Sequence, residues 1–184
     1  SPQTAARRAA DLIEAAGFSQ SFYEPKNFTA SSLPDVSTNF DYLCCPRSVS
    51  DLSSKIGLGH LGPKVRRIIK HATFPVLLTS PVYKPWISIS VFFGGSSNAV
   101  NALKLGIKIA MASGLDLKIH TLMEDGDEAY YRALIEDRNL SAPVAQLCKE
   151  WRFYDTSAFE SMLYEVEHDA LIVLGAYGHG IVKD

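Results

Sequence analysis

The second half of the chain alternates short apolar runs with segments of helical periodicity. Residues 87–93 are rich in β-branched and aromatic side chains, which is typical of strands, and residues 117–123 are predicted to be the next strand. Between them, Gly94-Gly95-Ser96-Ser97 turns the chain into a predicted helix, Asn98–Ser113, which Gly114 ends. The apolar positions that share one face of this helix are Val100, Leu103, Ile107 and Ala110.

The alternation continues along the rest of the chain. A helix is predicted over 128–137 and a strand within 146–154, and a helix over 158–167 is expected to begin at a capping box of Ser157 and Glu160. Alternating strands and helices require parallel strands joined by right-handed crossovers. We therefore predict an α/β fold with an open, mostly parallel, Rossmann-like sheet that carries helices on both faces. Its predicted central strands are residues 89–93, 117–120 and 171–174.

The first half of the chain is predicted to contain fewer elements, separated by a longer irregular connection over 26–37. Prolines at positions 81 and 85 disfavour a continuing central strand, which places a domain boundary near residue 85. The predicted elements are a helix over 5–16 ended by Gly17, a short strand over 21–24, a buried strand over 42–45, a helix over 63–71 and a strand over 75–79.

The most informative segment is the apolar run Ala170–Leu174, which stops at three glycines, Gly175, Gly178 and Gly180. An unbroken apolar run fits a strand that is buried on both faces of a sheet. Glycines after such a strand let backbone N–H groups face a ligand, and open α/β sheets bind ligands at the carboxyl ends of their strands. A glycine-rich turn with no ligand is the alternative that the residues leave open.

Bulk composition excludes several classes of function. The net charge of −2 gives no electrostatic basis for binding nucleic acid or an anionic membrane, and no apolar run reaches the roughly 18 residues that span a bilayer. Three cysteines, with Cys44 and Cys45 adjacent, form no disulfide framework and fit burial in strands and a reducing cytoplasm. The histidines show no metal-ligand spacing; we expect His71 to cap a helix and His120 to pack within a strand.

A weak internal repeat indicates two related modules. Phe22-Tyr23-Glu24-Pro25 recurs as Phe153-Tyr154-Asp155-Thr156, an offset of 131 residues, since 153 − 22 = 131. The stretch beginning Asp41-Tyr-Leu-Cys-Cys matches the one beginning Asp169-Ala-Leu-Ile-Val at an offset of 128, since 169 − 41 = 128. Matches of the same kind, in the same order and at nearly the same spacing, predict a duplication.

Three segments together resemble the universal stress protein family. Residues 57–77, with a glycine-started helix, His71-Ala72 and Pro75-Val76-Leu77, look like the end of one domain of that family. Residues 89–103 look like the start of a second copy, and 168–178 are similar to the penultimate strand and glycine loop of that copy. The resemblance implies a tandem protein in which 1–85 is the C-terminal part of a first domain and 86–184 the N-terminal and central part of a second. Both copies are incomplete relative to the family pattern.

The resemblance also implies a nucleotide site in the second copy. Gly175 and Gly178 match the first two glycines of the family's phosphate loop, and the third element would follow Asp184. The other residues placed at the expected site are His179, Gly180, Gly94, Gly95 and Ser96. Ser96 is expected either to meet phosphate or to cap its helix. Gly94 stands where the family's nucleotide-binding members have an acidic residue, which argues against Mg²⁺.

In the first copy, Pro46 and Val49 occupy the two glycine positions, so that copy is not expected to bind nucleotide. The leading interpretation is a cytoplasmic stress-response module that binds ATP or another adenine nucleotide and dimerises through antiparallel pairing of the strand over 75–79. The first alternative is a nucleotide-free interaction module of the same fold, and the second is a hydrolase or nucleotidyl-transfer enzyme. No acid or base near Gly175 points to catalysis.

Overall fold

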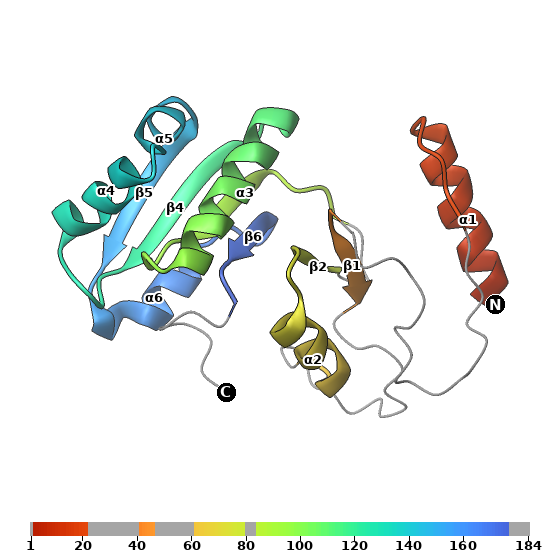
Figure 1. Cartoon of the computed structure of the whole chain (residues 1–184), viewed down its shortest axis with the longest axis horizontal. Helices are drawn as coiled ribbons and strands as arrows, with labels where there is room; N and C mark the ends of the chain where they lie inside the picture. Colours follow the sequence, from red (N-terminus) through yellow and green to blue (C-terminus); the bar gives the residue numbers. More distant parts are fainter. Residues whose placement is uncertain (1, 22–40, 47–60, 80–83, 177–184) are drawn as a thin grey trace. The chain divides into compact units, whose positions relative to one another are not determined.

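The computed structural model describes residues 2–21, 41–46, 61–79 and 84–176 (Figure 1). It divides the chain into two compact units, Ser1–Phe40 and Asp41–Asp184. In the first unit, helix α1 spans Pro2–Ala15, which confirms the predicted helix and starts it three residues earlier. The predicted strand over 21–24 and the connection over 26–37 fall largely outside the described residues.

The larger sheet of the second unit contains four parallel strands in the order β5-β4-β3-β6. The strands are β3 (Ser88–Phe92), β4 (Asp116–Leu122), β5 (Cys148–Tyr154) and β6 (Ala170–Leu174). The parallel α/β architecture confirms the predicted fold class, and β3 and β4 are central as expected. The prediction that residues 171–174 form a central strand was wrong for the sheet described, because β6 pairs only with β3.

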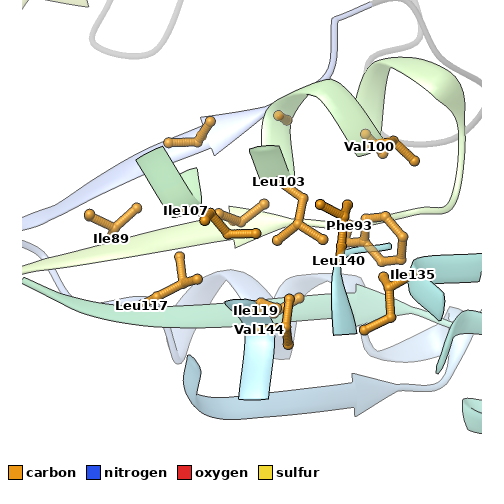
Figure 2. Close-up of a cluster of buried hydrophobic side chains, with 14 of the residues drawn as sticks. Ile89, Phe93, Val100, Leu103, Ile107, Leu117, Ile119, Ile135, Leu140 and Val144 are labelled. Carbon is orange, nitrogen blue, oxygen red and sulfur yellow. The ribbon is translucent and has the colours of Figure 1, made fainter. Parts of the chain in front are cut away.

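Helices cover both faces of this sheet. α3 (Ser97–Ser113) connects β3 to β4, α4 (Glu128–Asp137) and α5 (Ser141–Leu147) connect β4 to β5, and α6 (Phe159–Tyr164) leads from β5 to β6. The first three helices share one apolar core with the strands, part of which Figure 2 shows. α6 contributes Met162 to a second cluster with Phe92, Leu122 and Tyr154. The alternation of buried side chains along β3 and β4 places these two clusters on opposite faces.

The sequence predicted the burial of side chains correctly on α3 and incorrectly on β6. β6 reads as a continuous apolar run, yet only alternate side chains are buried, and Ile172 and Leu174 are 47% and 43% exposed. Within the described part of the chain, the strand is therefore covered on one face, which corrects the expectation of burial on both. On α3 the four predicted core positions are buried, and Gly114 ends the helix in a left-handed conformation, as expected.

Two helices differ from their predictions. α5 was not predicted. It follows Asn139, whose left-handed conformation (φ = 57°) lets the chain change direction after α4. The predicted helix over 158–167 is shorter, because a 3₁₀ turn over Thr156–Ala158 precedes α6. Ser157 lies inside that turn and Ala158 occupies the N-cap, so the expected capping box with Glu160 does not form and no side chain caps the helix.

The second unit also contains a smaller sheet, in which β1 (Leu43–Pro46) pairs in parallel with β2 (Val76–Thr79). Helix α2 spans Pro63–His71, as predicted, and Pro63 lies in its first turn. Cys45 is buried but Cys44 is exposed, since adjacent strand residues point to opposite faces and one face of β1 is open. Burial of both cysteines was therefore a wrong prediction. The predicted domain boundary near residue 85 and the tandem repeat stay predictions.

Candidate functional site at the carboxyl ends of β3 and β6

The strand order places a topological switch point between β3 and β6. From β3 the chain moves to β4 and then to β5 on one side, and it returns through α6 to place β6 on the other side of β3. In open α/β sheets, ligands bind at the carboxyl ends of the two strands that flank such a reversal. The segments that follow these two strands are the Gly94–Ser97 turn after β3 and Gly175-Ala176 after β6.

The turn after β3 presents the N-terminus of α3. The Ser96 hydroxyl accepts a hydrogen bond from the amide of Ala99 at 3.2 Å, and the Ser96 carbonyl accepts one from Val100 at 2.9 Å. The amides of Ser97 and Asn98 have no partner inside the helix. The first turn of α3 contains no acidic residue, so the positive end of the helix dipole is not neutralised there. This end of α3 can therefore accept an anion.

Gly95 lets the turn adopt a left-handed conformation, and Gly94 leaves the backbone of the turn without a side chain. Gly95 has φ = 80°, a left-handed conformation that other residues rarely adopt. A Cβ on Gly94 would meet no atom within 4 Å among the described residues. The Gly94 backbone is therefore accessible to a ligand, and a side chain at this position would project into free space.

Gly175 lies directly against the first turn of α3. A Cβ on Gly175 would be 2.6 Å from the carbonyl carbon of Asn98 and 2.7 Å from the amide nitrogen of Ala99. The Asn98 side-chain amide also donates to the carbonyl of Ala176 at 2.7 Å. These contacts fix the loop after β6 on the N-terminus of α3, and only glycine allows the approach.

The loop after β4 is fixed by Tyr131 of α4. Its hydroxyl accepts from the amides of Glu124 and Asp125, both at 3.1 Å, and donates to the carbonyl of Leu122 at 3.3 Å. The Tyr131 ring is fully buried. The loop contains Glu124, Asp125 and Asp127, and it lies at the carboxyl edge of the sheet because β4 is the neighbour of β3. Glu128, at the start of α4, is paired with Arg132.

The structure brings four of the predicted site residues to one place: Gly94, Gly95, Ser96 and Gly175. The other three, Gly178, His179 and Gly180, lie outside the described residues. Ser96 acts as the N-cap of α3, one of its two expected roles. Sequence reasoning missed Asn98 as the residue that joins the two loops. An amide side chain in the first turn of a helix after a glycine turn is the signal that could have found it.

The described part of the chain contains no group of three or more histidine, cysteine, aspartate or glutamate side chains placed to hold a metal ion. Gly94, at the position where the resemblance implies a carboxylate, supplies no ligand. The Ser96 hydroxyl caps α3 and the Asn98 side-chain amide donates to Ala176, so the groups that the switch point offers are chiefly backbone amides. Backbone amides suit phosphate or hydroxyl groups better than a cation.

Comparison with known proteins gives no family assignment. No model of a known protein family matches the chain, and a search of curated proteins finds no significant match. Within the described residues, no helix has the length and apolar character that a membrane crossing requires.

Proposed function

We propose that the second module binds an adenine nucleotide at the switch point between β3 and β6, as a universal stress protein-like regulatory module of the cytoplasm. The observation that carries the proposal is the contact of Gly175 with the first turn of α3, because it joins a glycine loop to free helix amides at the carboxyl edge of a parallel sheet. The phosphates would lie against the amides of Ser97 and Asn98, with the Gly94 backbone beside them.

The proposed binding does not depend on a divalent cation. Gly94 supplies no carboxylate, so the phosphate charge would be balanced by backbone amides and by the dipole of α3. Glu124, Asp125 and Asp127, which follow β4, add negative charge to the same edge of the sheet, whereas Glu128 is paired with Arg132. That charge opposes a triphosphate more strongly than a monophosphate or a diphosphate, because Coulomb repulsion grows with the charge of the ligand.

Calorimetric titration of the full chain with ATP, ADP and AMP tests the proposal. Each nucleotide is titrated once with Mg²⁺ and once with EDTA. We expect binding in both conditions, with ADP and AMP at least as tight as ATP when Mg²⁺ is absent. Absence of binding heat for all three nucleotides in both buffers, together with no change in thermal unfolding temperature on their addition, would contradict the proposal.

The second candidate function is a nucleotide-free interaction module, and the exposed face of β6 favours it. Ile172 and Leu174 are large apolar side chains, each more than two-fifths exposed, on the last strand of the described sheet. An apolar strand at a sheet edge is a site for pairing with another chain. Self-association through β2 or β6 is the corresponding partner proposal, and sedimentation of wild type and Ile172→Lys tests it. A concentration-dependent dimer that Ile172→Lys dissociates supports β6; a dimer that the substitution leaves intact points to β2.

A further inference from the structure

The face of the sheet that α6 covers contains a polar group that the nucleotide proposal does not use. On β3 and β4, Ser88, Ser90 and His120 are each at least 97% buried, and they point away from the apolar core that α3 covers. Two of their polar atoms, the Ser90 hydroxyl and Nε2 of His120, have no hydrogen-bond partner among the described residues. Buried polar atoms without partners are uncommon in folded proteins and point to a functional constraint.

A hydrogen-bonded chain runs from His120 to the surface. Nδ1 of His120 lies 3.1 Å from the Tyr154 hydroxyl, and that hydroxyl donates to Oε2 of Glu165 at 2.9 Å. Glu165 directly follows α6, and Arg152 donates to the same carboxylate oxygen. The chain therefore links β4, β5 and the C-terminus of α6. Its outer members, Arg152 and Glu165, are exposed, so protons can reach it from solvent.

The chain determines the tautomer of His120. An ionised carboxylate only accepts, so the single proton of the Tyr154 hydroxyl is directed to Glu165. The Tyr154 oxygen then accepts from Nδ1–H of His120, which leaves Nε2 with a bare lone pair inside the protein. This assignment follows from the hydrogen-bond network. A proton added at Nε2 would create a buried N–H donor that lacks an acceptor.

The charges around His120 come from three elements. Lys118 lies on β4, Glu150 and Arg152 on β5, and Glu165 after α6; the residues of β3 that face it, Ser90 and Phe92, do not titrate. Burial, followed by the charge of Arg152, holds the pKa of His120 below its ordinary value, against the opposite effects of Glu150 and Glu165. A protonated His120 would thus be a buried cation, disfavoured by burial and by Arg152 more than Glu150 and Glu165 favour it.

We propose that His120 is an acid-sensitive latch that keeps α6 on the sheet, and that its protonation releases α6. α6 is the removable cover, because it has six residues and Met162 is the only one of them that is buried in the described structure. Its release would hydrate the imidazolium, while the core on the opposite face keeps the sheet folded. The latch is independent of the proposed nucleotide site.

Hydrogen exchange of the full chain, followed by mass spectrometry at pH 7.5 and pH 5.5 and corrected for intrinsic rates, tests this inference. Peptides covering residues 158–166 report on α6, and peptides from α3 are the internal reference. We expect exchange in α6 to rise several-fold at pH 5.5 relative to α3. His120→Asn keeps a donor near the Nδ1 position and cannot titrate, so its α6 exchange should not depend on pH.

His168→Asn is the matched control, because it removes an exposed histidine that lies outside the hydrogen-bonded chain; this variant should respond as wild type does. Tyr154→Phe breaks the chain and should raise α6 exchange at both pH values. The inference is overturned if α6 in wild type shows no greater response than α3, or if His120→Asn responds as strongly as wild type. Circular dichroism at pH 7.5 confirms that each variant is folded.

Discussion

Gly175 and Asn98 are in backbone contact: a Cβ on Gly175 would lie 2.6 Å from the carbonyl carbon of Asn98. Because the obstacle is backbone at the start of a 17-residue helix, it cannot move aside as a flexible side chain would. We expect Gly175→Ala to destabilise the protein by about 1–3 kcal/mol, the usual cost of overpacking. Gly94→Ala is the control, since its Cβ meets nothing within 4 Å, and it should stay within about 1 kcal/mol of wild type. Urea unfolding measures both; equal effects of the two substitutions would contradict the contact.

Ser96 caps α3 through its hydroxyl, whereas its neighbour Ser97 is exposed at the first helical position. Ser96→Ala should lower the free energy of unfolding by about 1 kcal/mol, because the amide of Ala99 loses its acceptor. Ser97→Ala should change it by less than about 0.5 kcal/mol, as surface substitutions usually do. Chemical denaturation of the two variants measures these changes. Equal free energies of unfolding for Ser96→Ala and Ser97→Ala would show that Ser96 does not cap the helix.

Tyr131 and Tyr130 form a second matched pair. Tyr131→Phe removes an acceptor for the amides of Glu124 and Asp125 and the donor to Leu122, and the loss of these buried and partly buried hydrogen bonds should cost about 1–3 kcal/mol. The Tyr130 side chain is 42% exposed, so Tyr130→Phe should be nearly neutral. Hydrogen exchange at residues 124–126 should also rise in Tyr131→Phe. Unchanged protection there would mean that the hydroxyl does not fix the loop after β4.

Gly106 lies in the middle of α3 against Val91, and a Cβ there would be 2.5 Å from Cγ2 of that buried valine. Alanine is a better helix former than glycine by about 1 kcal/mol, but the contact with Val91 opposes this gain. We expect Gly106→Ala to be destabilising on its own, and Val91→Ala to restore part of the loss in the double variant. A double-mutant cycle measures the coupling, and strict additivity of the two substitutions would refute the close contact.

Acid should weaken the fold through Glu167. Lys118 and Ser88 donate to the two carboxylate oxygens of Glu167, and these hydrogen bonds hold its pKa below the ordinary value of 4.5. A carboxyl with a lowered folded pKa stabilises the protein above its unfolded pKa, and this stabilisation is lost as pH falls through the folded pKa. Below pH 4.5 the free energy of unfolding should therefore fall more steeply in wild type than in Glu167→Gln. Glu160→Gln, on the exposed surface of α6, is the control. If Glu160→Gln reduces the pH dependence of the free energy of unfolding as much as Glu167→Gln does, the contacts of Glu167 are not the cause of that dependence.

Local patterns were sufficient to predict most of the larger sheet and its helices. Val100 and Leu103 lie on the buried face of α3, as their spacing indicated, and the glycines after β3 and β6 lie at the same edge of the sheet. Sequence did not reveal that Ile172 is exposed, because an apolar run looks the same in a central strand and in an edge strand. The bridge from Asn98 to Ala176 joins residues 78 positions apart, and no local pattern encodes such a pairing.

The polar residues of β3 and β4, which are Ser88, Ser90 and His120, were not recognised as a buried group from the sequence. His120 was expected to pack within a strand, and it does, but its hydrogen bond to Tyr154 depends on the register between β4 and β5. That register follows from the fold as a whole. Burial of His120 could be inferred from its strand, whereas its partner could not.

Nucleotide binding at the switch point is tested most directly by titrating ADP, in EDTA, into wild type and Gly94→Leu. The Cβ of the leucine would meet no described atom within 4 Å, and circular dichroism checks that the variant is folded. Lys108→Leu, an exposed position near the other end of α3, is the control for adding an apolar surface residue. The account predicts binding to wild type and Lys108→Leu and an affinity at least about tenfold weaker, a loss of about 1.4 kcal/mol, for Gly94→Leu. Equal affinity of all three proteins, or no binding to folded wild type, would contradict it.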